Sequence, residues 1–280
     1  MTAATGYAAV DQYRDAIQDL INGGNVEAAV SKLTQPTLDA ISRTTHGGSD
    51  GGDDKVEDTL WGLWSAFVRA ARETPEEKVH DRLITGLQTI KSLPPVLVQK
   101  NGDKEQYSIW DLRVWDDLPV FGAELREEWN YTDEGDETKR TQWANLNAFV
   151  ARIVVAQLSD FELYAIWTLR DALESPELDE GDASLNGHVP AAAQWIFIAG
   201  SLIYENDREW SPPPNQGNPA RGGPLAPDVK KGFSKERWAL WKKGFQAVSK
   251  NSGSQVAEGT KGTATKALQK MEEIENKSQR

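Results

Sequence analysis

The sequence predicts an all-α fold: one multi-helix globular domain with a central buried helical hairpin and a C-terminal amphipathic basic helix. Three observations support this. Apolar residues recur at spacings of three and four along most of the 280 residues. Two segments, 160–174 and 190–205, are apolar almost all round, as helices inside a domain are. The chain also shows no βαβ succession, which argues against Rossmann and P-loop folds.

In the N-terminal half, one-sided apolar faces predict helices over residues 10–21, 25–41, 60–71 and 74–92. The last of these begins with Thr74-Pro75-Glu76-Glu77, which combines a cap, a proline at the first position and an early glutamate. The glycine-rich residues 46–54 lack the Gly-Lys-Ser/Thr ending of a phosphate-binding loop and are expected to be a linker. Residues 93–109 are predicted to form a short hairpin around Asn101-Gly102.

In the C-terminal half, the same spacing predicts helices over residues 116–130, 140–158, 160–174, 190–205, 234–249 and, weakly, 264–277. The predicted organisation is a helical core over residues 1–210, with its core helices in 110–205. A Pro/Gly linker (211–227), a basic aromatic helix docking on the core (228–250) and a flexible polar tail (251–280) follow.

The composition excludes several classes of site. The chain has no cysteine and three histidines, so disulfides, thiolate chemistry and a zinc site are not expected, and neither a metal nor a cofactor is predicted. The N-terminus has neither a basic nor an apolar region of a signal peptide. The longest apolar run, 191–204, is too short to span a bilayer. We therefore expect a cytoplasmic protein without membrane contact.

Charge is distributed unevenly. The formal net charge is −12, but residues 228–250 hold seven basic and two acidic residues, a net charge of +5. Lys235, Lys242 and Lys243 lie on the predicted helix 234–249 beside a tryptophan face, an arrangement that fits contact with a phosphate backbone, as in tRNA. The alternative is that the tryptophan face docks on the core and the lysines lie over its acidic surface.

Charged residues on the predicted central helices are candidates for catalysis. Trp167, Arg170, Asp171 and Glu174 share one side of helix 160–174. They either pair within the helix, as Arg170 with Glu174, or face a pocket. Arg152, on helix 140–158, either forms a salt bridge with Asp171 or Glu174 or binds an acyl or phosphate oxygen.

Acidic residues also gather beside aromatic residues in Trp115-Asp116-Asp117-Leu118-Pro119 and the segment that follows. Such a cluster can bind a cationic group or magnesium, or can stand at a helix N-terminus favoured by the helix dipole.

Four segments resemble a filamentous-fungal, all-helical family of formerly unassigned function. They are Trp115–Pro119, Asn145–Arg152, Trp167–Glu174 and Val189–Tyr204. That group is similar to the arginine-containing cyclodipeptide synthases. The resemblance implies aminoacyl transfer from charged tRNAs to make a cyclic dipeptide in fungal secondary metabolism. It supplies no catalytic motif to carry over.

Matching this chemistry to the residues gives each candidate an expected role. Catalysis is assigned to Arg152, Arg170, Asp171 and Glu174, and substrate binding to Asp116, Asp117, Asn145, Tyr164, Trp167 and Trp195. The attacking amine needs a base and the oxyanion needs a donor. Two further hypotheses stay open: a non-catalytic helical interaction protein, and a small-molecule cyclase or isomerase.

Overall fold

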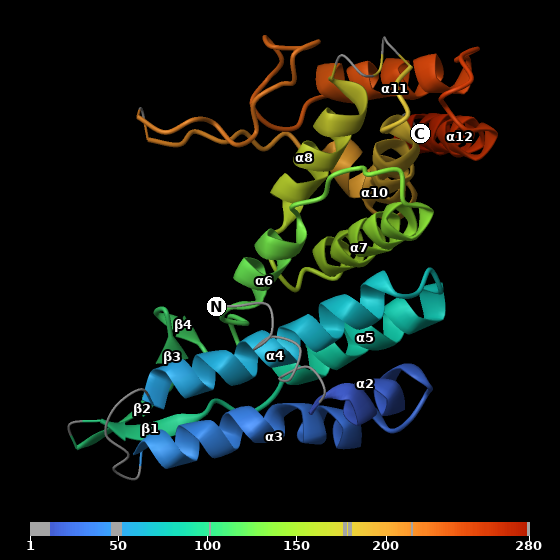
Figure 1. Cartoon of the computed structure of the whole chain (residues 1–280). Helices are drawn as coiled ribbons and strands as arrows, with labels where there is room; N and C mark the ends of the chain where they lie inside the picture. The colour runs from blue at the N-terminus through green and yellow to red at the C-terminus, as the bar shows by residue number, and fades with distance from the viewer. Residues whose placement is uncertain are drawn as a thin grey trace. The chain divides into compact units, whose positions relative to one another are not determined.

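The computed structural model describes residues 12–45, 52–100, 102–175, 178, 181–213 and 215–278. Most of the described chain is helical, and its strands form two short pairs (Figure 1). The predicted all-α class is therefore confirmed. The chain divides into two compact units, Met1–Tyr131 (unit 1) and Thr132–Arg280 (unit 2), and each is described separately.

Unit 1 contains a helical bundle. Its described helices are α2 (Arg14–Ile21), α3 (Val26–Thr45), α4 (Gly52–Arg72), α5 (Glu77–Lys91) and α6 (Phe121–Glu128). Helices α2 to α5 pack against one another, and α6 packs on α4. The predicted apolar faces point inward, so that Leu20, Leu33, Leu63 and Leu87 are fully buried. These contacts give unit 1 a hydrophobic core of its own.

Two antiparallel hairpins connect α5 to α6. In the first, β1 (Leu97–Lys100) pairs with β2 (Asp103–Gln106) on either side of residues 101–102, as the sequence predicted. In the second, β3 (Ser108–Ile109) pairs with β4 (Leu112–Arg113), and Ile109 lies opposite Leu112. This second hairpin was not predicted, because its turn lacks the glycine or asparagine that such tight turns favour.

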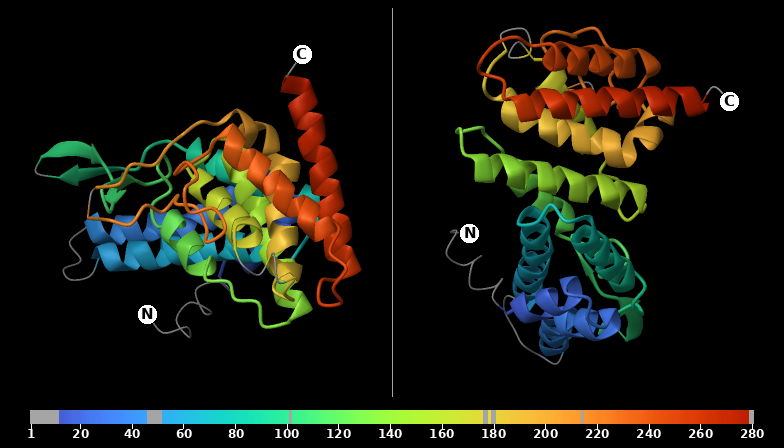
Figure 2. Two further views of the ribbon diagram at one scale, coloured as in Figure 1. Left: turned by 90° about the horizontal axis from the view of Figure 1, so that it is seen from above. Right: turned by 90° about the vertical axis from the view of Figure 1, so that its right-hand side faces the viewer.

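Helix α10 (Leu185–Glu205) is the centre of unit 2. Four helices pack against it: α7 (Glu137–Val155), α8 (Glu162–Leu173), α11 (Lys235–Ser249) and α12 (Glu258–Ser278) (Figure 2). The direct packing of α8 on α10 forms the predicted buried pair of helices. An apolar residue on any side of α10 therefore finds a neighbouring helix, which explains why its sequence is apolar almost all round.

The C-terminal segment differs from the predicted flexible tail. Helix α12 packs on both α10 and α11, and Ala264, Ala267, Met271 and Ile274 are buried there. The spacings of three, four and three place these residues on one helical face. Of the predicted linker 46–54, residues 46–51 lie outside the described residues, and α4 begins at Gly52.

A buried amide ties three helices of unit 2 together. Asn147 on α7 is fully buried, and its Oδ1 accepts hydrogen bonds from Thr168 Oγ1 on α8 (2.8 Å) and Trp195 Nε1 on α10 (2.7 Å). Its Nδ2 donates to Trp143 O (2.9 Å). Buried polar groups of this kind are costly unless they are paired, so the network fixes how the three helices meet.

Replacing this amide tests its role. We expect Asn147→Ala to lower the free energy of unfolding by about 2 to 3 kcal/mol, because two buried donors lose their acceptor. Thr168→Val, which removes one donor and leaves Asn147 with Trp195, is the matched control and costs about 1 kcal/mol. Urea unfolding followed by circular dichroism measures both. Equal values for the two variants would contradict the prediction.

Candidate functional site

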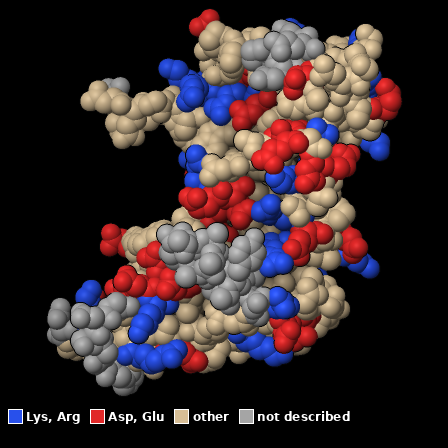
Figure 3. Space-filling view, in the orientation of Figure 1, with Lys and Arg blue, Asp and Glu red and all other residues tan. Residues whose placement is uncertain are grey.

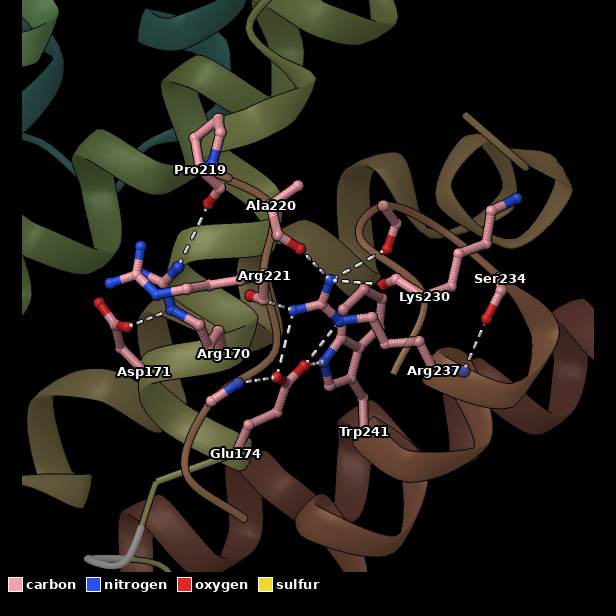
Figure 4. Close-up of polar contacts among 12 residues, drawn as sticks. Arg170, Asp171, Glu174, Pro219, Ala220, Arg221, Lys230, Ser234, Arg237 and Trp241 are labelled. Atoms are coloured by element: carbon pink, nitrogen blue, oxygen red, sulfur yellow. Dashed lines mark hydrogen bonds and ion pairs between the residues drawn. The ribbon is translucent and has the colours of Figure 1, made fainter. Parts of the chain in front are cut away.

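One of the charged residues predicted for the α8 segment, Glu174, belongs to a buried ion pair in unit 2. Glu174, directly after α8, and Arg237, in the first turn of α11, are both fully buried. Arg237 Nε donates to Glu174 Oε1 (2.8 Å) and Arg237 Nη2 donates to Oε2 (3.1 Å), which makes the pair bidentate (Figure 4). Trp241 Nε1 also donates to Oε1 (2.7 Å), and the Gly223 N–H donates to Oε2 (2.7 Å).

The rest of the Arg237 guanidinium binds the segment that precedes α11. Its Nη1 donates to the carbonyl oxygens of Ala220 (2.8 Å), Gly232 (3.1 Å) and Lys230 (3.3 Å), and its Nη2 to that of Arg221 (3.1 Å). Every nitrogen of the guanidinium therefore has an acceptor, as a buried arginine requires.

This arrangement changes the interpretation of residues 211–227. They were predicted to be a linker, but Ala220 is fully buried and the backbone around it is hydrogen-bonded to Arg237. Gly223 approaches Glu174 so closely that a Cβ at this position would lie 2.4 Å from the Glu174 carbonyl oxygen. The absence of a side chain at Gly223 therefore allows its backbone to pack against Glu174.

The predicted Arg170–Glu174 pair does not form, because Glu174 is bound to Arg237. Arg170 instead contacts Asp171 (Nε to Oδ1, 3.1 Å) and Pro219 O (3.3 Å). Trp167 Nε1 also donates to Pro219 O (2.9 Å). These polar groups of α8 therefore bind the 219–223 segment, and their proposed catalytic roles stay predictions.

The other predicted residues of unit 2 lie in its helices. Arg152 Nη1 donates to Ala148 O (3.3 Å) within α7, and Asn145 on the same helix is buried. Trp195 is fully buried in the Asn147 network. Tyr164 stacks edge-on with Trp167, at 5.0 Å between ring centroids. The described contacts bring Arg152 to neither Asp171 nor Glu174, although sequence spacing allowed both.

The apolar face of the basic helix α11 packs against α12, α8 and α10. Packing of this face on neighbouring helices was one of the two alternatives that the sequence left open. Lys242 pairs with Glu275 of α12 (2.6 Å). Lys235 lies over the ring of Tyr204 (3.0 Å from Nζ to the centroid). Lys243 is exposed. On the face shown in Figure 3, basic side chains are interspersed with acidic ones. A nucleic-acid role for these three lysines stays a prediction.

The predicted acidic cluster belongs to unit 1 and supports the loop before α6. Both oxygens of Asp117 accept from Arg113 (2.8 and 2.9 Å), and these hydrogen bonds lower the pKa of Asp117 to about 2. Asp116 Oδ2 accepts from Gln106 Nε2 (2.7 Å). Within unit 1, therefore, these two carboxylates hold neighbouring chain segments in place.

A carboxyl group with a raised pKa lies between α4 and α6. Glu124 is buried, and its Oε1 accepts from Ser65 Oγ (2.6 Å). Burial raises the pKa of Glu124 to about 7, and the nearby Glu127 and Glu128 add to the effect, while Ser65 and Arg72 oppose it. Glu124 is thus protonated in the fold at mildly acidic pH.

Unit 1 also has an apolar hollow of about 390 Å³. It is lined on one side by α3 and on the other by the residues after α5 and by Trp115. The lining residues include Val30, Thr34, Leu38, Pro94, Pro95 and Trp115. Its polar lining residues are Glu27, Ser31, Thr34 and Thr89.

The tip of the β3–β4 hairpin is the most unusual surface of unit 1. Its two turn residues, Trp110 (φ +52°) and Asp111 (φ +60°), both have left-handed backbone conformations, as a type I′ turn requires. Trp110 is 51% exposed, and its Nε1 donates to Glu57 Oε2 on α4 (3.0 Å). Trp61 Nε1, one turn along α4, donates to Glu57 Oε1 (3.2 Å). We call Glu57, Trp61 and Trp110 the indole corner.

Sequence reasoning missed two of these features, and each had a signal. Arg237 and Trp241 are four residues apart and share the buried face of α11, which marks Arg237 as a buried charge in need of a partner. Ile109 and Leu112 flank Trp110-Asp111 in the spacing of a two-residue hairpin.

Among the described residues, no group of three or more histidine, aspartate or glutamate side chains is arranged to hold a metal ion. No helix in the described ranges combines the length and the apolar character needed to cross a bilayer.

The fold and these contacts define a mostly helical protein in which a buried ion pair binds the backbone of unit 2 and an exposed tryptophan, Trp110, lies on a hairpin tip of unit 1. The chain belongs to the DUF3632 family, described as a protein of unknown function, whose model matches residues 64–245. No curated protein and no solved structure matches the chain.

The ion pair gives a direct stability prediction. Arg237→Met should lower the free energy of unfolding by about 3 to 5 kcal/mol, because it leaves the Glu174 carboxylate buried without a cation. Lys243→Met, at an exposed position of the same helix, is the control and changes stability by less than about 0.5 kcal/mol. Thermal or urea unfolding measures both. A small effect of Arg237→Met would show that the pair is solvated.

Glu124 makes stability depend on pH. Its pKa in the fold is about 7, above the value of 4.5 expected in the unfolded chain, so the folded state binds more protons between these values. Stability is therefore fully present below about pH 4.5 and falls as pH rises through 7, by about 3 kcal/mol. Glu124→Gln should remove this loss. Urea unfolding at pH 5 and pH 8 checks the difference, and a parallel loss in the variant would assign it to another group.

Proposed function

We propose that the protein is a binding protein and that the β3–β4 hairpin tip of unit 1 contacts a partner protein. One observation carries the proposal: a tryptophan that is 51% exposed occupies a turn position that strains it. Left-handed conformations cost non-glycine residues about 1 to 2 kcal/mol each. Strain of this kind collects at functional sites, where the surrounding structure over-determines it.

The surroundings of the hairpin support a contact role. Leu112, directly after the turn, is 38% exposed, so two apolar side chains of the hairpin, Trp110 and Leu112, face solvent. Tryptophan is among the residues that contribute most to protein interfaces. Three more non-glycine residues between the hairpin and α6 have positive φ: Trp115 (+76°), Leu118 (+48°) and Val120 (+71°). The Trp64 Nε1 hydrogen bond to Pro119 O (2.8 Å) anchors this segment to α4.

Aminoacyl transfer from charged tRNAs to form an arginine-containing cyclodipeptide is a second proposal, which rests on the resemblance of the four sequence segments. In unit 2, Glu174 forms an ion pair with Arg237, and Lys242 forms one with Glu275. Two of the residues with an expected role in this chemistry are therefore already paired within the fold. Incubation of the purified chain with arginyl-tRNA and a second aminoacyl-tRNA, followed by mass spectrometry, tests it. An arginine diketopiperazine supports the synthase, and its absence rejects it.

The binding proposal predicts the effect of removing the exposed indole. Trp110→Ala should weaken partner binding by about 2 kcal/mol, or roughly thirtyfold, because hot-spot aromatics contribute this much. Proteins captured from a lysate of the same organism by wild type and variant are compared by mass spectrometry. The affinity of the purified partner is then measured by calorimetry.

Leu225→Ala is the matched control, since Leu225 is 41% exposed but belongs to unit 2. It should leave binding unchanged. The proposal is wrong if Trp110→Ala and wild type bind the purified partner with the same affinity.

A further inference from the structure

The indole corner is held together by a single carboxylate. Glu57 Oε1 accepts from Trp61 Nε1 (3.2 Å) and Glu57 Oε2 accepts from Trp110 Nε1 (3.0 Å). The ring centroids of the two tryptophans are 6.4 Å apart, and their planes meet at 70°. The two indoles are therefore fixed nearly perpendicular to each other, with a negative charge at their nitrogen edges.

This geometry suits a cation. The face of an indole ring carries negative electrostatic potential, and tryptophan attracts cations more strongly than other aromatic residues do. With their centroids 6.4 Å apart, both rings lie within cation–π distance of a single group placed beside them. Asp53, one turn before Glu57 on α4, and Asp111, next to Trp110, are exposed and add negative charge nearby.

We propose that the indole corner binds a methylated ammonium group on a lysine side chain of a partner protein. The inference rests on the proposed function and names the chemistry that the partner presents. It deepens that proposal because it names the charged group that the corner would select on the partner.

The corner satisfies a methylated ammonium without any new hydrogen bond. A guanidinium seeks hydrogen-bond acceptors, and here it would have to share each Glu57 oxygen with an indole N–H. A trimethylammonium group donates no hydrogen bonds and spreads its charge over methyl groups. It therefore needs only ring faces and a nearby negative charge, which the corner supplies.

Exposure favours a protein as the source of the cation. Because Trp110 is 51% exposed, the corner is open and encloses little of a small free ligand. A side chain on a peptide gains further contact from the hairpin, where Leu112 is also exposed. A free quaternary ammonium such as choline lacks these contacts.

The test uses the full chain labelled with ¹⁵N-tryptophan and a synthetic probe, acetyl-Ala-Ala-trimethyllysine-Ala-Ala-amide. Trp61→Phe and Trp110→Phe assign the two indole N–H signals. We expect the probe to shift both signals and to bind at least fivefold more tightly than three comparison peptides. These carry unmodified lysine, arginine, or an uncharged isostere in which carbon replaces the quaternary nitrogen.

Glu57→Gln separates charge recognition from a structural role. It should reduce the preference for trimethyllysine over the uncharged isostere at least threefold, with an unchanged unfolding midpoint confirming the fold. Asp58→Asn, at an exposed neighbouring position, is the matched control and should keep the preference. The inference is overturned if the uncharged or the arginine peptide binds as tightly as the probe. It is also overturned if the preference persists in Glu57→Gln.

Two further outcomes separate this inference from the proposed function. If choline binds as tightly as the peptide probe, the protein source of the cation is wrong. If a purified partner binds through Trp110 but the probe shifts neither indole signal, the binding proposal stands and the methylated ammonium is rejected.

Discussion

The buried pair of Glu174 and Arg237 is the interaction on which the architecture of unit 2 depends. It joins the end of α8 to the start of α11 and, through the other guanidinium N–H groups, fixes the backbone of residues 220–232. An isolated charge in such a place would be strongly unfavourable, so the chain supplies acceptors for every nitrogen. A segment rich in proline and glycine thereby becomes an ordered part of the fold.

In unit 1, by contrast, the notable residues lie in an unfavourable backbone conformation at the surface. Its hairpin tip keeps Trp110 and Asp111 in conformations that glycine and asparagine adopt more easily. Glu57 holds the exposed indole against Trp61 rather than leaving it to move freely. Residues in a strained turn that are nonetheless fixed in place are what a recognition surface needs, because a rigid contact loses little entropy on binding.

Sequence periodicity was sufficient for the helices because each apolar stripe is a local property of the chain. The apolar stripe of α12, at positions 264, 267, 271 and 274, was visible too, but the helix is otherwise so polar that its burial was not predicted.

The partners of the charged residues in the candidate sites were less predictable. Helical spacing made Arg170 the natural partner of Glu174, yet the partner is Arg237, 63 residues away. Asp116 and Asp117 looked like a ligand set, yet they bind Gln106 and Arg113.

The sequence by itself determined the all-α class, the inward faces of the helices and the uneven charge, because these depend on residue type and near-neighbour spacing. Only the tertiary structure decided which charges are paired and which aromatic groups stay exposed. Ion pairing depends on where distant segments meet, as when Glu174 receives N–H groups from Arg237, Trp241 and Gly223. The indole corner likewise exists only because a hairpin tip returns to α4, where Glu57 binds both rings.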